Sequence, residues 1–393
     1  MIPSILPTYN RAPLSFQKGE GAWLTEADGT RYLDLGAGIA VNALGHANPD
    51  LVAALTEQAN ALWHVSNLYN IPAQQKLADL LVEHTFADTA FFTNSGTEAC
   101  ELAVKMARKH FHDAGQPERT DIITFTGSFH GRSSAGIAAA ASEKMTKGFG
   151  PLLPGFVNLP FGDHEALSNA ITDTTAAILI EPIQGEGGIR PVPDQCLKGL
   201  RDRCNYHGIL LIFDEVQCGM GRTGKLFAHE WAGIAPDIMM VAKGIGGGFP
   251  LGAVLATEKA ASGMTAGSHG STYGGNPLAC AVGARVMEIM TDPAFLPEVN
   301  RKAGLLRQGL ESLVASHPGV FEAVRGNGLM LGLKCIAANT DVVAAGYGEH
   351  LLTVPAADNV VRLLPPLTLT DADISEALAR LDRAAAKVQA SES

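Results

Sequence analysis

The sequence lacks several features that mark common classes of protein. It has no apolar run of membrane-spanning length, and its first residues, MIPSILPTYNR, lack the basic start and apolar core of a secretory signal peptide. Its six cysteines show no CxxC spacing, and its twelve histidines show neither HExxH nor a comparable ligand spacing. We therefore expect a cytoplasmic protein with reduced thiols and no metal centre.

Basic residues are also scarce. The chain has 29 lysines and arginines against 40 aspartates and glutamates, which gives a formal net charge of −11. Nucleic acids and anionic membranes need a basic surface, so neither is an expected partner. Nucleotide-binding signatures are absent, because no P-loop and no GxGxxG after a strand occurs. The composition that remains, 46% hydrophobic and 18% charged, fits an enzyme that acts on small molecules.

The length of 393 residues is large for a single hydrophobic core and predicts two domains. Asp28-Gly29, between two alternating segments, predicts a hairpin turn near the start. Apolar periodicity then predicts a helix over residues 49–62. The predicted units are an N-terminal segment that packs with the small domain (1–48), a large domain (49–276) and a small α/β C-terminal domain (277–393).

Two short apolar runs end at charged residues. Ile209–Phe213 stops at Asp214, and Ile238–Ala242 stops at Lys243. Such runs are typical of strands in a parallel sheet covered on both faces, and ligands bind these sheets beyond the carboxyl ends of the strands. Asp214 and Lys243 are therefore expected to face one crevice, where burial would make the lysine an amine nucleophile. The alternative is a salt-bridged pair at the strand ends without a chemical role.

A third strand, Ala90–Thr93, leads into the polar turn NSGT and then into a helix. The turn brings backbone N–H groups, hydroxyl groups and the positive end of a helix together, which predicts an anion site. The alternative is that Ser95 or Thr97 serves only as the N-cap of the helix.

A fourth strand over residues 121–125 leads to Phe129 and Arg132. An isolated aromatic residue at such a place belongs by default to the core, and an arginine in a Gly/Ser turn is by default a solvated surface charge. At a strand's carboxyl end, however, the planar guanidinium of Arg132 matches the carboxylate of an amino-acid substrate.

A fifth strand over residues 176–180 leads to EPIQGEGG, in which Glu181 and Glu186 lie at or beyond the strand end. A helix that Asp194 caps and Gly208 ends then leads to the next strand, which makes a right-handed βαβ unit. Five strands thus bring polar side chains to one edge of the sheet, and this convergence is stronger evidence for a site than any single motif.

The motif DEVQCGMGRTG, which begins at Asp214, and the motif VAKGIGGGFPLGA around Lys243 resemble the class III family of pyridoxal-phosphate-dependent aminotransferases. The resemblance extends from Tyr9 to Arg362. It implies fold type I of these enzymes, an α/β fold with a mostly parallel central sheet in a large domain and a smaller α/β C-terminal domain. It also implies that Lys243 carries the cofactor covalently and that Asp214 keeps the pyridine nitrogen protonated, which makes the cofactor an electron sink.

The same resemblance assigns further residues. Phe129 stacks on the pyridine face, the turn after the third strand holds the phosphate, and Thr272 reaches the cofactor of the neighbouring subunit in a homodimer. The residues expected to contact the cofactor are Ser95, Gly96, Thr97, Phe129, Asp214, Glu215, Val216, Gln217, Lys243 and Thr272. The residues expected to bind the substrates are Arg132, Ser271, Glu186 and Arg362.

Two of these substrate-binding residues are expected to act as a switch. Arg362 binds the carboxylate of 2-oxoglutarate, and Glu186 pairs with Arg362 when the first substrate is bound. The alternative is a permanent ion pair that joins the two domains.

Within the family, the motifs GIAVNALGH (residues 38–46), SGTEA, SFHGRS and EPIQGEGG most resemble the branch that acts on N2-acetylornithine in arginine biosynthesis. That branch transfers the amino group to 2-oxoglutarate and yields N-acetylglutamate 5-semialdehyde and glutamate. Gly38 stands just before the AVN run, where the ornithine aminotransferases carry a tyrosine, which predicts room for an acyl group. Ornithine, succinylornithine and 4-aminobutyrate branches share the cofactor residues and stay open, as does a cofactor-binding module without turnover.

Overall fold

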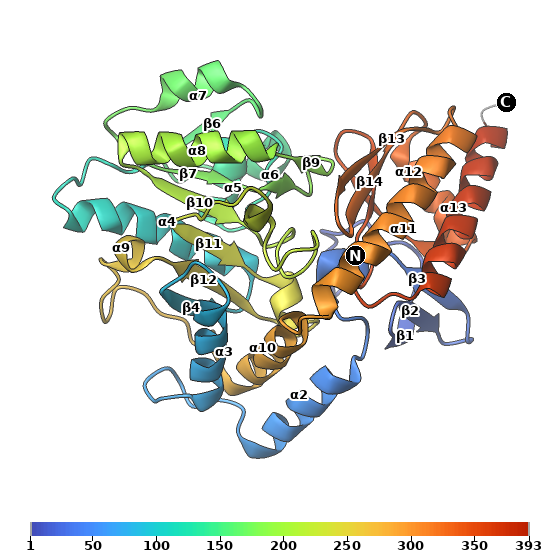
Figure 1. The fold of residues 1–393 in the computed structure, drawn as a ribbon, viewed down its shortest axis with the longest axis horizontal. Helices are drawn as coiled ribbons and strands as arrows, with labels where there is room; N and C mark the ends of the chain where they lie inside the picture. Colours follow the sequence, from blue (N-terminus) through green and yellow to red (C-terminus); the bar gives the residue numbers. More distant parts are fainter. Residues whose placement is uncertain (1, 392–393) are drawn as a thin grey trace.

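The computed structural model describes residues 2–391. Its centre is a seven-stranded sheet with the strand order β4-β12-β11-β10-β7-β5-β6 (Figure 1). Strand β12 alone runs opposite to the other strands, so the predicted mostly parallel sheet is confirmed. Its strands are β4 (Thr89–Thr93), β5 (Asp121–Phe125), β6 (Phe156–Leu159), β7 (Thr175–Ile180), β10 (Leu210–Asp214), β11 (Ile238–Val241) and β12 (Gly252–Ala256).

Both faces of this sheet are buried, as the unbroken apolar runs predict. Every residue of β7, β10 and β11 is buried. Leu211 and Phe213 belong to one core cluster and Leu210 and Ile212 to another, because successive side chains of a strand point to opposite faces. The helices between the strands of this sheet in the chain are α4 (Gly96–Asp113), α5 (Ser134–Ala140), α6 (Glu143–Thr146), α7 (His164–Ala170) and α8 (Asp194–His207), and α9 (Glu258–Ala261) follows its last strand.

The predicted βαβ unit is formed by β7, α8 and β10, and the two strands are parallel. Gly208 ends α8 in the left-handed conformation, with a φ of 62°. The predicted cap at Asp194 is wrong, because Pro193 occupies the N-cap position with an extended backbone. Asp194 instead lies in the first turn, where a carboxylate is favourable beside the positive helix end.

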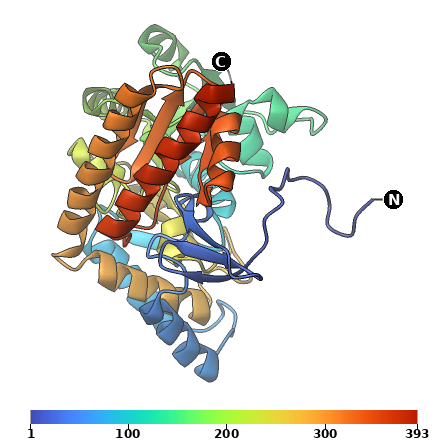
Figure 2. The same ribbon diagram turned by 90° about the vertical axis from the view of Figure 1, so that its right-hand side faces the viewer.

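The C-terminal part is a four-stranded antiparallel sheet, in the order β13-β14-β17-β16, with three helices grouped beside it (Figure 2). The strands are β13 (Phe321–Asn327), β14 (Met330–Cys335), β16 (Val354–Ala356) and β17 (Val360–Leu363), and the helices are α11 (Phe295–Ser316), α12 (Asn339–Gly348) and α13 (Asp371–Ser391). Helix α10 (Pro277–Met290) packs against α2 (Pro49–Ala61) and α3 (Pro72–Glu83) below the central sheet (Figure 1). The domain boundary before residue 277 stays a prediction.

The N-terminal segment forms a small sheet of β1 (Phe16–Glu20), β2 (Trp23–Glu26) and β3 (Arg31–Asp34), and the predicted hairpin turn joins β2 and β3. Its last strand, β15 (Leu351–Leu352), comes from the C-terminal part and runs parallel to β3. The next turn, α1 (Ala37–Ala40), is left-handed, with φ values of 46°, 64°, 62° and 64°. Such a run is costly for residues with a Cβ atom.

The remaining short elements are β8 (Ile183–Gln184), β9 (Arg190–Pro191) and the 3-10 turns η1 (Ala228–Trp231) and η2 (Lys243–Gly246). Among residues 2–391, no helix is both long enough and apolar enough to cross a membrane. All six cysteines are free thiols.

Candidate active site

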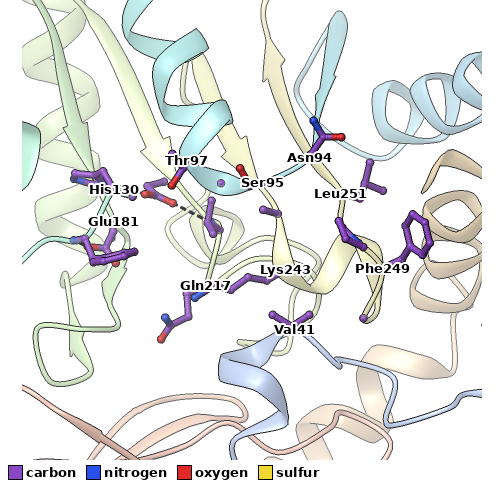
Figure 3. A pocket seen from close by; sticks show the side chains of 18 residues that line it. Val41, Asn94, Ser95, Thr97, His130, Glu181, Gln217, Lys243, Phe249 and Leu251 are labelled. Atoms are coloured by element: carbon purple, nitrogen blue, oxygen red, sulfur yellow. Dashed lines mark hydrogen bonds and ion pairs between the residues drawn. The ribbon is translucent and has the colours of Figure 1, made fainter. Parts of the chain in front are cut away.

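The polar residues at the five strand ends meet around one cavity of about 360 Å³. The turns after β4, β5, β7, β10 and β11 form its wall, and Val41 joins them from the N-terminal segment. Figure 3 shows Lys243 among the lining side chains, with Ser95 and Thr97 on one side of it and Gln217 and Val41 on the other. The cavity has the size and position of a small-molecule site in an α/β sheet.

Lys243 is the first residue of η2, directly beyond β11. Its φ of 50° is a left-handed conformation that side-chain-bearing residues seldom adopt and that is found mainly at functional sites. Burial lowers the pKa of its amine to about 8, although the nearby carboxylate of Glu186 opposes this shift. A larger share of the amine is therefore neutral at pH 7 than in an ordinary lysine, as a nucleophile requires.

Two hydrogen bonds hold the carboxylate of Asp214. Its Oδ2 lies 2.8 Å from Nδ1 of His130, and its Oδ1 accepts from the N–H of Val216 at 3.0 Å. Burial alone would lower the pKa of His130, but the bond to Asp214 and the charges of Asp214 and Glu181 raise it above its ordinary value. The ion-pair partner of Asp214 in residues 2–391 is thus His130, so the alternative of a simple salt bridge to Lys243 does not hold.

Glu181 is a lining residue that sequence reasoning left without a role. Its carboxylate accepts from the N–H groups of Phe129, at 2.9 Å, and Gly185, at 3.2 Å. Burial raises its pKa to about 7, with His130 opposing and Asp214 adding to the shift. Glu181 therefore fixes the loop that carries Phe129 and can change protonation near neutral pH. The available signal was an acid directly after a wholly apolar strand, the same signal that singled out Asp214.

The turn after β4 is held by two hydrogen bonds at the start of α4. Oγ of Ser95 accepts from the N–H of Glu98 at 3.3 Å, and the carboxylate of Glu98 accepts from the N–H of Asn94 at 2.6 Å. The N-cap role considered for Ser95 is confirmed. It is compatible with an anion site, because the N–H groups of the first turn have no intrahelical partner. Oγ1 of Thr97 accepts from the N–H of Arg132 at 3.2 Å and joins this turn to the one after β5.

Among the other residues expected at the cofactor, Gly96, Phe129, Val216 and Gln217 line the cavity. A Cβ atom at Gly96 would lie 2.9 Å from Cγ1 of Val216, so the two turns approach as closely as glycine allows. Glu215 differs, because its buried carboxylate accepts from the N–H of His229 at 2.9 Å and lies 2.7 Å from Nδ1 of the same residue. Its side chain therefore anchors η1 and is not part of the cavity wall.

Glu186 and Arg362 form an ion pair with two contacts, of 2.6 Å and 3.1 Å. Glu186 follows β8, and Arg362 lies in β17 of the C-terminal part. Nη1 of Arg362 also donates to Oε1 of Gln217 at 3.2 Å, which places the pair at the edge of the cavity. The pair joins the two parts of the chain. Whether it opens during turnover stays a prediction.

Besides Glu215, the predicted residues Ser271, Thr272 and Arg132 do not line this cavity. Ser271 accepts from the N–H of Gly274 at 2.9 Å within its own turn, and Thr272 is exposed. Arg132 is also exposed, with its guanidinium carbon 5.5 Å from the ring centroid of Phe129. Their roles stay predictions. An exposed Thr272 is what a contact with a neighbouring subunit requires.

The cavity residues fit pyridoxal phosphate. The first turn of α4, an 18-residue helix, offers N–H groups to a phosphate. The buried carboxylate of Asp214 suits a protonated ring nitrogen, and the desolvated amine of Lys243 suits covalent attachment. A metal would find no comparable set, since no three His, Cys, Asp or Glu side chains gather as ligands in the described part of the chain.

Comparisons with known proteins agree with this geometry. The family model of the class-III aminotransferases matches residues 6–385. The chain is 72% identical to an acetylornithine aminotransferase of Rhodobacter capsulatus, with 99% of both chains covered, and 61% identical to one of Mesorhizobium japonicum, with 98% and 96% covered.

Two solved structures are similar over nearly the whole chain. The ornithine aminotransferase of Toxoplasma gondii has a TM-score of 0.95 at 30% identity, with 99% of this chain and 94% of that chain covered. The N-acetylornithine aminotransferase of Stenotrophomonas maltophilia has a TM-score of 0.86 at 39% identity, with 98% of both chains covered. From the matched model, the relatives and the geometry of the cavity, the chain belongs to the class-III aminotransferases.

Proposed function

We propose that the protein transfers the amino group of N2-acetylornithine to 2-oxoglutarate, which yields N-acetylglutamate 5-semialdehyde and glutamate in arginine biosynthesis. The observation that carries the proposal is the 72% identity, over 99% of both chains, with an acetylornithine aminotransferase. It is supported by the fact that Lys243, Asp214 and the Ser95–Thr97 turn line one cavity.

Pyridoxal phosphate supplies an electron sink to the substrate carbon that loses its proton. Lys243 would hold the cofactor, Asp214 would pair with its ring nitrogen, and Gly96 and Thr97 would hold its phosphate. His130 keeps the carboxylate of Asp214 in place, because the two side chains share a short contact of 2.8 Å away from water.

Lys243 is also the residue that moves the proton. Its Nζ would take the proton from the substrate carbon and then return it, acting as base and then as acid. A pKa of about 8 suits both duties near neutral pH, since neither form is then costly to reach.

The two substrates differ in where they carry charge. 2-Oxoglutarate has a carboxylate beside its reacting carbonyl, and the fork of Arg362 matches that group. N2-acetylornithine has a neutral chain beside its reacting amine, and Glu186 then keeps Arg362 paired. We assign the far end of N2-acetylornithine, with its own carboxylate, to Arg132 and Ser271.

We further infer a homodimer in the cytoplasm, with Thr272 reaching the neighbouring site. Trp63, Leu68, Tyr69 and Tyr273 are 62% to 84% exposed, and monomers seldom leave such large apolar side chains together on a surface. The segment that contains Trp63, Leu68 and Tyr69 touches the turn that contains Tyr273, because the rings of His64 and Tyr273 lie 5.3 Å apart. The free thiols fit a reducing compartment.

The test is glutamate formation from 2-oxoglutarate with a panel of amino donors and cofactor-loaded protein. We expect the highest kcat/KM with N2-acetylornithine. A higher value with ornithine, succinylornithine or 4-aminobutyrate would assign another branch of the family. Cofactor binding without glutamate formation from any donor would indicate a binding module.

A further inference from the structure

A second cavity, of about 290 Å³, lies between α7 and α8. These helices lie at the upper edge of the molecule in Figure 1, at the β6 end of the central sheet, whereas α2 and α3 lie at its β4 end. All buried residues of its lining are apolar, whereas its polar lining residues are exposed or half-buried. The buried residues are Phe125, Leu167, Ile180, Val192 and Leu200. The cavity is thus an apolar chamber with a polar rim.

A cysteine and a histidine meet in the lining of this chamber. Cys196 is in the first turn of α8, His164 is the first residue of α7, and Sγ lies 3.8 Å from Nε2. This is within hydrogen-bond distance for sulfur, so the imidazole can take the thiol proton and leave the thiolate, which is the reactive form.

Cys196 differs from the other cysteines of the chain. It is half-buried, whereas the other five are buried. Burial raises the pKa of the Cys204 and Cys280 thiols to about 12 and that of Cys335 to about 11, and it raises those of Cys100 and Cys218 well above their ordinary value. The five buried thiols therefore lack both access and thiolate character, and an electrophile that enters the protein should find one reactive sulfur.

We propose that Cys196 and His164 form a covalent capture site for α,β-unsaturated carbonyl compounds with a short apolar tail. The tail occupies the apolar chamber, where its burial is favourable, and the reactive carbon reaches the rim. The thiolate forms a bond to the β-carbon, and the π electrons of the double bond move to the α-carbon and carbonyl. The proton held by His164 then goes to the α-carbon, so the step is an addition without a leaving group or redox change.

The experiment compares two maleimides with the cofactor-loaded, full-length protein. N-phenylmaleimide carries an apolar tail, and N-(2-hydroxyethyl)maleimide carries a polar one. Rates are divided by those with a small free thiol, and sites are mapped by mass spectrometry. We expect one adduct per chain, on Cys196, and a rate about tenfold higher for the phenyl compound, as burial of an aromatic ring predicts.

Three variants separate the parts of the site, and a fourth, His207→Gln, is the control. Cys196→Ser should take no label. His164→Gln should react about 100-fold more slowly because the base is gone, whereas His207→Gln, at the far end of α8, should react like the wild type. Gly199→Leu fills the chamber, since a Cβ atom there meets nothing within 4 Å, and should abolish the preference for the phenyl compound.

Labelling of another cysteine first, equal normalised rates for the two maleimides, or an unchanged preference in Gly199→Leu would each overturn the proposal. Melting temperatures of all four variants show whether each is folded, so a lost label is read only from folded protein.

Discussion

Arg362 and Glu186 meet fork to fork, yet only one of them is buried. The side chain of Arg362 is 1% exposed and that of Glu186 is 36% exposed. A half-exposed carboxylate can turn to water at small cost, whereas a buried guanidinium needs another anion in its place. A substrate carboxylate has the shape to take over both contacts, of 2.6 Å and 3.1 Å.

The first prediction follows from this asymmetry. Glu186→Ala leaves Arg362 open, so the half-reaction with glutamate should become about tenfold faster and that with N2-acetylornithine about tenfold slower. Stopped-flow measurement of both half-reactions is the check. Asp358→Ala removes a carboxylate from Arg325 in the same C-terminal sheet and should change neither rate. An equal loss in both half-reactions with a lower melting temperature would indicate a permanent pair instead.

The second prediction concerns the pH dependence of cofactor attachment. Below its pKa of about 8, the amine of Lys243 is mostly protonated and cannot attack a carbonyl. The rate of attachment to the apoprotein, followed by visible absorption, should therefore fall about tenfold for each pH unit below that value and level off above it. Lys243→Ala should bind the cofactor without the absorption band and lose nearly all turnover. Borohydride trapping on a different lysine would exclude the assignment.

The third prediction concerns Asp214. Asp214→Asn keeps the shape of the side chain but removes the charge that faces the ring nitrogen. Turnover should fall about 1,000-fold, with a smaller loss in cofactor affinity. The pKa of His130 should also fall in this variant, because the carboxylate of Asp214 no longer opposes the effect of burial. NMR titration of the imidazole can measure this change. Near-normal turnover would mean that another group keeps the ring nitrogen protonated.

The fourth prediction concerns donor choice at Gly38. The protein should strongly prefer N2-acetylornithine over ornithine, and Gly38→Tyr should reduce this preference. Because φ at Gly38 is 64°, the tyrosine should also destabilise the fold by about 1 kcal/mol. Gly21→Ala, with a φ of 57° and open space around its Cβ, reproduces the strain away from the cavity and serves as the control. Equal kcat/KM values for both donors in the wild type would contradict this account.

The fifth prediction tests whether Thr272 acts across subunits. Thr272→Ala should weaken cofactor binding, and Lys243→Ala is inactive. A mixed dimer of the two variants contains one site with both an intact Lys243 and the partner's Thr272, so it should recover about half of the wild-type activity per dimer. Recovery is followed after subunit exchange with tagged chains. A mixed dimer no better than Thr272→Ala alone would place the threonine in its own subunit's site.

The sequence predicted best those strands whose run of apolar residues directly reflects their burial in the fold. The unbroken apolar runs before Asp214 and Lys243 predicted β10 and β11, because burial on both faces leaves no place for a polar residue. Strand β12 was not predicted, since a short GAVLA segment after a glycine run becomes a strand only through its antiparallel neighbours. The left-handed turn at 37–40 was equally hidden, because alanine and isoleucine favour the right-handed form.

In the candidate site, too, the sequence predicted some features and not others. Asp214, at the end of β10, and Lys243, just past β11, were predicted to share one cavity because parallel strands end at a common edge, and both line it. The bond between His130 and Asp214 depends on how the loop after β5 approaches the end of β10, and neither segment alone indicates it. Ser271 and Thr272 lie in a turn in which the N–H of Gly274 bonds to Ser271. The sequence shows only that this turn is rich in glycine, and that does not reveal whether a turn lines the cavity.

The pairing of β3 with β15 has a consequence for synthesis on the ribosome. Trp23 of the N-terminal sheet donates to Asp373, which lies 350 positions later in the chain. All seven strands of the central sheet lie between these two residues in the chain. That sheet can therefore form in the nascent chain before β15, the partner strand of β3, has been synthesised. The carboxylate of Glu186 likewise meets Arg362 only when the last part of the chain emerges, which makes completion of the cavity edge a late event in folding.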